Sequence, residues 1–257
     1  MSSPGAPVEI RGELPAIILA AGRGTRMKTG EAKAAVSVNG RPMAARVIDA
    51  MRRAGASRVI VVVGHRADDV RAAIGADVEY VVQEEQLGTG DAVKCAGPAL
   101  STHQGPVLIA HADIPLLRET DVRHLLQRHL SSGAAATMLT AEFQEPGSLG
   151  RVMRGDDGRV VGIVEARDAT PEQLKIKEIN VAVYCFQGPL LFNALTQVDN
   201  DNAQGQYYLT DVIGILVSRG ERVEAVTMEH SHGGLGVDTA EDLARARSIS
   251  AAHEYFS

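Results

Sequence analysis

LPAIILAAGRGTRMKTGEAK, residues 14–33, is the segment from which the architecture can be predicted, because an apolar run here gives way to a glycine-rich, basic turn. The run at 16–21 is short and bounded by Pro15 and Gly22, which is typical of a strand buried on both faces of a parallel sheet. Gly22 and Gly24 allow a tight turn that brings backbone N–H groups close to an anion. The turn carries four basic residues, Arg23, Arg26, Lys28 and Lys33. The segment therefore predicts a strand that leads into a polyphosphate-binding loop.

The glycine spacing in this segment excludes two common phosphate-binding motifs. The dinucleotide fingerprint requires a third glycine at the position of Met27, and the P-loop requires Gly-Lys-Ser/Thr, which does not occur in the sequence. A turn whose glycines serve only the backbone conformation remains an alternative interpretation of the segment taken alone.

Helical and strand-like segments alternate along the rest of the chain. Helices are predicted at 41–54, 67–74, 88–99, 119–131, 208–219 and 239–253. Strands are predicted at 58–63, 78–82, 106–110, 135–141, 179–186 and 222–227. This alternation predicts right-handed crossovers and a doubly wound, mostly parallel α/β sheet. Ligands of such sheets bind beyond the carboxyl ends of the strands, where we expect the loops after Ala20, Val82 and Ala110 to meet.

The domain organisation is predicted to be simple. We expect a flexible, polar N-terminus at 1–13 and a single domain at 14–257. Within the domain, the segments 151–154 and 160–164 flank the turn sequence GDDG and predict a β-hairpin. We expect this hairpin to belong to a small β-rich insertion at about 145–205 that caps the sheet.

Composition narrows the class of protein. With 45% hydrophobic and 23% charged residues over 257 positions, the chain can bury the core of a soluble protein. The net charge of -6 and the lack of a basic block argue against nucleic-acid and membrane-surface partners. Cys95 and Cys185 have no metal-type spacing, so neither a zinc site nor a disulfide scaffold is expected. Without a signal-peptide core or an apolar run that could span a bilayer, a cytoplasmic location is expected.

The first motif, L-A-A-G-x-G-T-R-M with Lys33 seven residues after Arg26, resembles the signature of the sugar-1-phosphate nucleotidyltransferases. The resemblance covers about residues 14–250 and is closest to the uridylyltransferase domain of the bacterial bifunctional N-acetylglucosamine-1-phosphate uridylyltransferase and acetyltransferase. It implies a Rossmann-like fold and catalytic roles for Arg26 and Lys33. It also implies a nucleotide-binding loop formed by Leu19, Ala20, Ala21, Gly22 and Gly24. Because the hexapeptide repeats of the acetyltransferase part are not found, we expect a monofunctional relative or an isolated first domain.

The second motif is QEEQLGTGD at 83–91, which follows a predicted strand and opens a predicted helix. Its glycines can present backbone N–H groups at the helix start, and the Gln83 amide can donate to and accept from the edge of a base. An ordinary loop with Thr89 as the helix cap is the alternative. The resemblance implies that Gln83, Gly88 and Thr89 bind the uracil ring and hold the nucleotide.

Two aspartates are candidate magnesium ligands. Asp113, in HADIPL at 111–116, directly follows a predicted strand beside the phosphate loop, and Mg²⁺ prefers oxygen ligands. The alternative is a cap for the next helix, and His111 is expected to be a loop residue because magnesium rarely takes imidazole. Asp238 precedes the last predicted helix, which Asp238 or Thr239 is expected to cap. The resemblance implies that Asp238 also binds the metal.

A sugar site is implied by four further matches to the family. By resemblance, the aminosugar phosphate would contact Gly150, Glu165, Asn180, Tyr208 and Thr210. A carboxylate and amides are the groups that sugar hydroxyls and an acetamido group require. Gln206 stands where the family has glutamate, and Asn180 is followed by Val-Ala instead of Thr-Gly. The identity of the sugar therefore stays open.

The expected activity is the transfer of a uridylyl group from UTP to N-acetylglucosamine-1-phosphate with Mg²⁺, releasing pyrophosphate. Another sugar phosphate or nucleotide is an alternative, since small-alcohol phosphate cytidylyltransferases and molybdenum-cofactor nucleotidyltransferases share a similar first motif. A non-catalytic nucleotide-binding regulator is an alternative of a different class. It would keep the glycine loops and lose the acidic residues, whereas Lys33, Asp113 and Asp238 are all present here. The sequence does not indicate an oligomeric state.

Overall fold

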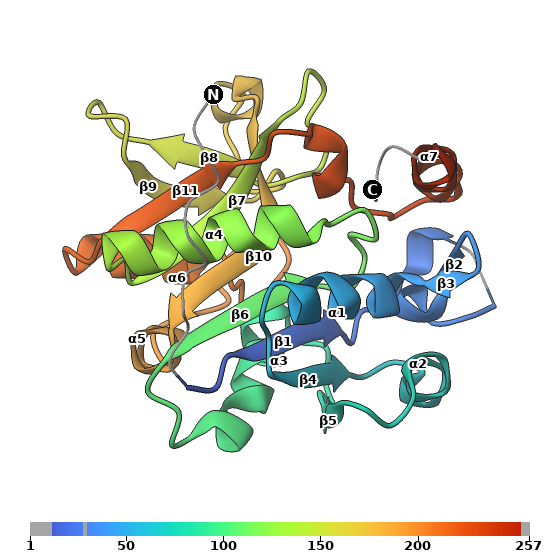
Figure 1. Cartoon of the computed structure of the whole chain (residues 1–257). Helices are drawn as coiled ribbons and strands as arrows, with labels where there is room; N and C mark the ends of the chain where they lie inside the picture. The colour runs from blue at the N-terminus through green and yellow to red at the C-terminus, as the bar shows by residue number, and fades with distance from the viewer. Residues whose placement is uncertain (1–11, 28–29, 253–257) are drawn as a thin grey trace.

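The computed structural model describes residues 12–27 and 30–252, which form one mixed β-sheet between two layers of α-helices (Figure 1). The strands of the sheet are β1 (Pro15–Ala20), β4 (Arg58–Val63), β5 (Glu79–Val82), β6 (Pro106–His111), β7 (Ala136–Glu142), β8 (Arg151–Arg154), β9 (Val160–Val164), β10 (Glu178–Gln187) and β11 (Val223–Thr227). Their order is β11-β7-β10-β6-β1-β4-β5, with β8 paired to β10 and β9 paired to β8. The predicted doubly wound, mostly parallel sheet is confirmed.

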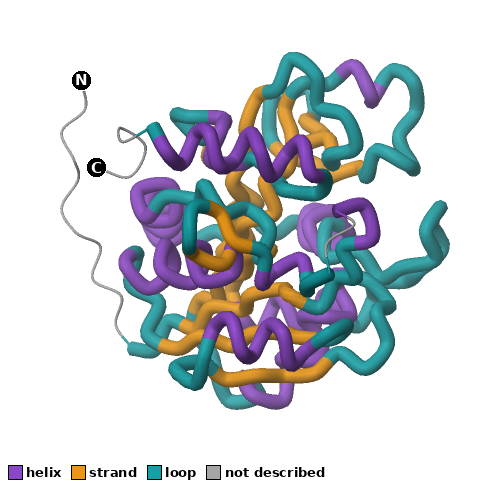
Figure 2. The backbone as a smooth tube through the Cα atoms, turned by 90° about the vertical axis from the view of Figure 1, so that its right-hand side faces the viewer, coloured by secondary structure: helices purple, strands orange, loops and turns teal. Residues whose placement is uncertain are grey.

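Helices cover both faces of this sheet (Figure 2). They are α1 (Met43–Arg53), α2 (Ala67–Ile74), α3 (Thr89–Ala96), α4 (Glu119–Ser132), α5 (Gly188–Leu195), α6 (Asp211–Ser218) and α7 (Ala240–Ala251). Successive side chains of β1 point to opposite faces, so Ile18 packs with residues of α1 and α4 while Ile17 packs with residues of α3 and α6. A strand buried on both faces accounts for the unbroken apolar run that the sequence shows at this position.

Strand direction determines which side chains reach the functional edge of the sheet. β1, β4, β5 and β6 are parallel, so their carboxyl ends lie at one edge. β10 is antiparallel to β6 and β7, so the beginning of β10 lies at that same edge. The insertion expected at about 145–205 stays a prediction, and within that range β10 belongs to the central sheet.

The observed helices differ from the predicted ones in three boundaries and in one additional helix. The helix expected at 41–54 begins at Met43, because β3 (Arg41–Pro42) pairs with β2 (Ser37–Val38) as a short hairpin. The helix expected from Gly88 ends at Ala96, and the helix expected from Tyr208 begins at Asp211. Helix α5 was not predicted, although Pro189 near its start is a common signal for a helix N-terminus.

Some sequence predictions lie outside the described residues. They concern most of the flexible N-terminus expected at 1–13, the basic side chain of Lys28, and the end of the helix expected at 239–253. None of the helices in the described parts of the chain has the length and apolar character needed to cross a membrane.

His129 on α4 predicts how the stability of the fold depends on pH. The side chain is fully buried, its Nδ1 lies 3.0 Å from Thr137 Oγ1, and burial lowers its pKa from 6.5 to about 4. The unfolded chain therefore binds a proton at a pH where the folded protein does not. We expect the free energy of unfolding to be maintained above pH 6.5 and to fall by up to about 3 kcal/mol as the pH drops to 4.

Urea unfolding of the wild type and of His129→Gln at several pH values measures this dependence. The Gln variant should lose most of the slope between pH 6.5 and 4, because it has no imidazole to protonate. His124→Gln is the matched control, since His124 is exposed on the same helix. Equal slopes in the wild type and His129→Gln would show that other groups cause the acid sensitivity.

Candidate active site

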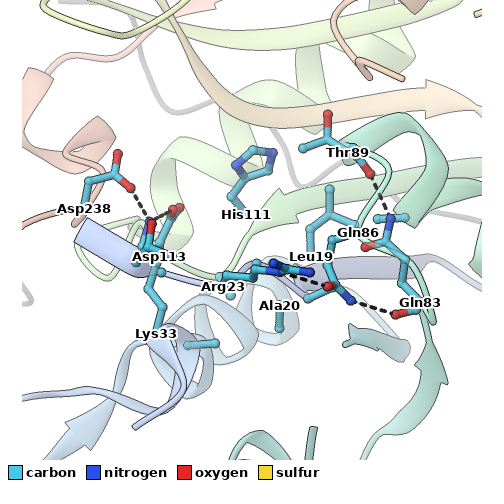
Figure 3. A pocket seen from close by; sticks show the side chains of 18 of the residues that line it. Leu19, Ala20, Arg23, Lys33, Gln83, Gln86, Thr89, His111, Asp113 and Asp238 are labelled. Carbon is cyan, nitrogen blue, oxygen red and sulfur yellow. Dashed lines mark hydrogen bonds and ion pairs between the residues drawn. The ribbon is translucent and has the colours of Figure 1, made fainter. Parts of the chain in front are cut away.

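A cavity of about 570 Å³ opens at the carboxyl ends of β1, β5 and β6 (Figure 3). Twenty residues line it: Leu19, Ala20, Ala21, Gly22, Arg23, Gly24, Thr25, Arg26, Lys33, Ala34, Gln83, Gln86, Gly88, Thr89, Ala92, His111, Ala112, Asp113, Gln206 and Asp238. The structure therefore brings together every residue predicted to bind the nucleotide or the metal, as well as both predicted catalytic residues. The three loops expected to meet at this edge do meet.

The glycine-rich loop after β1 lines the cavity. Gly24 has a φ of +58°, and a Cβ atom placed on it would lie 2.6 Å from the Cβ of Lys33. Glycine at this position therefore serves two needs, a left-handed backbone and the close approach of Lys33. The sequence indicated only the first of these, since the packing of Lys33 on Gly24 is a tertiary contact.

One end of the cavity concentrates charge. The Nζ atom of Lys33 lies 2.5 Å from Asp113 Oδ2 and 2.6 Å from Asp238 Oδ1, and Arg26 NH2 lies 2.9 Å from Asp238 Oδ1. Burial by itself would lower the pKa of Lys33, but the two carboxylates outweigh it and raise the pKa. Burial would raise the pKa of Asp113, but the charge of the Lys33 ammonium and its hydrogen bond to Asp113 outweigh burial and lower the pKa. Lys33 is therefore an ammonium and Asp113 a carboxylate at neutral pH.

A small hydrophobic cluster holds the loops that carry these charges. It joins buried side chains from the glycine loop, the β2–β3 hairpin, the segment after β6 and helix α7, among them Met27, Leu116 and Val237. The Val237 N–H also donates to the backbone oxygen of Asp113 at 2.9 Å, which ties the two acidic loops together. Residues distant in the sequence thus meet at one point because their apolar neighbours pack together.

The helix caps leave both aspartates free to face the cavity. Thr239 caps α7, since its Oγ1 accepts from the Asp242 N–H at 3.1 Å while Asp242 Oδ2 accepts from the Thr239 N–H at 2.9 Å. Of the two caps considered for this helix, Thr239 is the one observed. Helix α4 begins at Glu119 with its capping contacts at Arg118 and Asp121, so Asp113 does not cap it.

His111 lines the cavity between its two ends. Burial lowers the pKa of its imidazole, and the nearby Asp113 opposes that shift without cancelling it. The ring is therefore neutral at neutral pH and adds a polar group without a charge. His111 is the last residue of β6, so the expectation that it is a loop residue is wrong.

The opposite end of the cavity is formed by amides and backbone groups (Figure 3). The amide nitrogen of Gln83 donates to the Gly88 oxygen at 3.0 Å and to Asp91 Oδ2 at 2.7 Å. Gln86 bridges to the glycine loop, since its Oε1 accepts from Arg23 Nε at 3.3 Å. This end presents amide side chains that can hydrogen-bond, whereas the Lys33 end is a cluster of ion pairs. A molecule with a hydrogen-bonding base and a polyphosphate matches that division.

Gly88 and the first turn of α3 pack closely on the segment that precedes α6. The Gly90 N–H donates to the Tyr207 oxygen at 2.8 Å, and the Tyr207 N–H donates to the Leu87 oxygen at 2.8 Å. Thr89 Oγ1 accepts from the Leu209 N–H at 3.0 Å, so the Thr89 side chain ties two segments together. These contacts place Gln206 in the cavity, a position that the sequence assigned to the sugar site.

Gly88 should not tolerate a side chain. Its φ is +122°, and a Cβ would lie 2.5 Å from the Tyr207 oxygen. Gly88→Ala is expected to lower the free energy of unfolding by about 1–3 kcal/mol through overpacking and backbone strain. Urea unfolding measures this loss, and Gly162→Ala is the control because its Cβ would meet no atom within 4 Å. Equal stability of the two variants would contradict the close packing.

The five predicted sugar-site residues lie together, outside the lining of the first cavity. Thr210 Oγ1 donates to Glu165 Oε1 at 3.0 Å, the Asn180 N–H donates to the Gly150 oxygen at 2.9 Å, and Tyr208 OH lies 3.3 Å from Asp168 Oδ2. Burial raises the pKa of Glu165. Glu165 and Tyr208 line a second cavity of about 350 Å³.

Two further residues of this region were not predicted. Tyr184 is fully buried, and its hydroxyl accepts from Asn180 Nδ2 at 2.6 Å, which orients the Asn180 amide. Asn180 Oδ1 accepts from the N–H of Ala182, whose φ of +60° belongs to an irregularity in β10. A non-glycine residue with a left-handed backbone gives no local sequence signal, although Gly at the same position of the resembled family does point to such a bend.

The carboxylates of Asp113 and Asp238 fit a hard divalent cation. Both already share one cation, the Lys33 ammonium, and their oxygens converge on one point. Among the described residues no group of three or more His, Cys, Asp and Glu side chains could hold a metal. A cation held by one or two carboxylates and by substrate phosphates is the usual arrangement for magnesium.

A protein-family model and several curated proteins match most of this chain. The profile of the MobA-like NTP transferase domain matches residues 16–212. The chain is 45% identical over 237 residues to the Bifunctional protein GlmU of Geobacter metallireducens, which covers 91% of the chain and 50% of that protein. It is 45% identical over 233 residues to the Bifunctional protein GlmU of Exiguobacterium sibiricum, covering 91% of the chain and 52% of that protein. The chain thus spans about half the length of the curated relatives it matches.

Solved structures share the fold at low sequence identity. A protein of Bacillus anthracis assigned as a glucose-1-phosphate thymidylyltransferase superposes with a TM-score of 0.76 at 18% identity, covering 93% of this chain and 96% of that one. A UDP-glucose pyrophosphorylase in complex with UDP-glucose superposes with a TM-score of 0.73 at 15% identity, covering 93% and 98%. At these identities the likeness describes the fold alone.

Proposed function

The chain belongs to the MobA-like NTP transferase family, and from that premise we propose that it transfers a uridylyl group from UTP to N-acetylglucosamine-1-phosphate, releasing pyrophosphate. The observation that carries the proposal is the division of the main cavity, with an amide end suited to a base and an ionic end suited to phosphates. The 45% identity to proteins named GlmU supports the choice of this sugar nucleotide over others.

In the proposed reaction an oxygen of the sugar phosphate attacks the α-phosphorus of UTP. The bond from that phosphorus to the oxygen bridging to the β-phosphate breaks, and pyrophosphate leaves. No covalent enzyme intermediate is needed, so the chain contributes positioning and charge neutralisation. We assign the cluster of Glu165, Asn180 and Thr210 to the sugar because it combines a carboxylate, an amide and a hydroxyl beside the main cavity.

Lys33 and Arg26 supply positive charge at the reacting phosphates. Two carboxylates accept hydrogen bonds from the Lys33 ammonium, which has three hydrogens, so one remains for a phosphate oxygen. Arg26 is more than half exposed at the rim, with a side-chain exposure of 57%, so it can turn toward a substrate that enters. Asp113 and Asp238 would hold Mg²⁺, which would neutralise phosphate charge when bound.

Pyrophosphate release across a matrix of nucleoside triphosphates and sugar-1-phosphates, with magnesium present, tests the proposal. UTP with N-acetylglucosamine-1-phosphate should give the highest kcat/KM. UTP with glucose-1-phosphate and dTTP with glucose-1-phosphate are the informative comparisons, because the structural neighbours carry those names. Turnover only with CTP and a phosphate that is not a sugar phosphate would overturn the proposal.

A further inference from the structure

Asp91 holds the side chain of Gln83 at the amide end of the cavity. Gln83 is only 3% exposed, and both hydrogens of its amide nitrogen are engaged, one by the Gly88 oxygen at 3.0 Å and one by Asp91 Oδ2 at 2.7 Å. The backbone of Gln83 is also fixed, since its N–H donates to the Val63 oxygen at 2.8 Å. The Gln86 amide nitrogen donates to the backbone oxygen of Gln83 at 3.2 Å.

These contacts determine which way the Gln83 amide faces. The Asp91 carboxylate and the Gly88 carbonyl are both hydrogen-bond acceptors, so a rotated amide would place Oε1 against two oxygens. The nitrogen must therefore face Asp91 and Gly88, which leaves Oε1 for the cavity that Gln83 lines. No donor in the described part of the chain makes a hydrogen bond to Oε1. Gln83 thus presents a fixed acceptor, although a free glutamine could donate as well.

A fixed acceptor distinguishes between nucleobases. The N3 atom of uracil carries a hydrogen and can donate to Oε1, whereas N3 of cytosine carries a lone pair and would be repelled by it. We propose that Asp91 determines the base preference of this site by holding Gln83 as an acceptor, so that a base with a ring N–H is selected over cytosine. Asp91 is thereby a positioning residue, which acts through Gln83. The inference rests on the proposed function, in which the base lies at the amide end.

Asp91 also has a simpler structural role that the experiment must separate. It lies in the first turn of α3, where an acidic side chain stabilises a helix through its dipole. Asp91→Leu removes the charge and the acceptor, whereas Asp91→Asn removes the charge and keeps an oxygen that can accept from Gln83. A dipole role alone predicts similar losses of stability in both variants and no change in base preference.

The test measures the dissociation constants of UTP and CTP by titration calorimetry with magnesium, without a sugar phosphate. We expect the wild type to bind UTP at least about 30-fold more tightly than CTP. The N3–H group of uracil donates a hydrogen bond to Oε1, whereas the lone pair on N3 of cytosine repels Oε1. Asp91→Leu should reduce this ratio by about 10-fold or more, and Asp91→Asn should stay within about threefold of the wild type. Asp91→Ser, too short to reach Gln83, should behave like Asp91→Leu and replaces it if the leucine variant does not fold.

The Gln83→Leu background shows whether Asp91 acts through Gln83. In that background Asp91→Leu should leave the UTP-to-CTP ratio unchanged, because coupled residues do not contribute independently. An unchanged ratio in Asp91→Leu, or a wild type that binds both nucleotides equally, would overturn the inference. Failure of the proposed function is a separate result, since it would appear as absent pyrophosphate release from UTP and N-acetylglucosamine-1-phosphate while the binding ratios are still measured.

Discussion

Replacing Lys33 by methionine is expected to lower kcat by about 100-fold or more, since the variant loses a preorganised positive charge at the reacting phosphates. The structure adds a second effect. Lys33 neutralises Asp113 and Asp238 at 2.5 and 2.6 Å, and without it the two carboxylates repel each other. We therefore also expect the free energy of unfolding to fall by about 3 kcal/mol, as for other charges left buried without a partner.

Steady-state kinetics and urea unfolding separate these two effects. Lys175→Met is the matched control, because Lys175 pairs with Glu172 on an exposed turn and should change neither quantity. The triple variant Lys33→Met, Asp113→Asn, Asp238→Asn isolates the effect on stability. It should recover the lost free energy of unfolding, because the two carboxylates that Lys33 neutralises are then absent, and it should remain inactive. A Lys33→Met variant with unchanged kcat would remove Lys33 from the reaction.

The two aspartates are expected to differ in their sensitivity to amide substitution. Asp113→Asn should reduce kcat by about 100-fold or more, because Asp113 is the carboxylate closer to Lys33 and its low pKa keeps it charged. Asp238→Asn should retain measurable activity and require more magnesium, since an amide oxygen is a weaker ligand than a carboxylate. Asp238 also pairs with the exposed Arg26, so part of its charge is already balanced.

Initial rates measured against magnesium concentration for both variants check this difference. Asp156→Asn, in the exposed turn between β8 and β9, is the control and should match the wild type. A role as a helix cap alone predicts no change in the magnesium requirement of Asp238→Asn, because asparagine caps a helix as well as aspartate. An unaltered half-saturating concentration in that variant would therefore count against the metal role.

Much of the framework could be predicted because it depends on short-range patterns. An apolar run between Pro15 and Gly22 predicts a buried strand, and β1 matches it within one residue. Helix α2, strand β4 and the β8–β9 hairpin have the predicted bounds, since periodicity and turn residues specify them locally. The loops after β1, β5 and β6 could be placed at one edge because parallel strands share a direction.

The ambiguities that remained in the sequence concern side chains with two possible roles. Asp238 could cap a helix or face a ligand, and only the observed cap by Thr239 shows that Asp238 is free to face the cavity. Thr89 was expected at the nucleotide, and its hydroxyl also holds the Leu209 N–H. Local sequence does not distinguish such roles, because both satisfy the same hydrogen-bonding capacity.

The sequence by itself determined the strand that leads into a glycine loop, the aspartate beyond β6 and the alternation that gives a doubly wound sheet. Only the tertiary structure decided that Lys33 lies between two aspartates 80 and 205 positions away in the chain. It also decided that the antiparallel β10 brings Asn180 to the functional edge, and that Gln206 lies in the main cavity. The physical reason is that the local pattern of apolar and polar residues determines whether a segment forms a strand or a helix. The order of the strands and the contacts between loops depend instead on how apolar surfaces far apart in the sequence pack together.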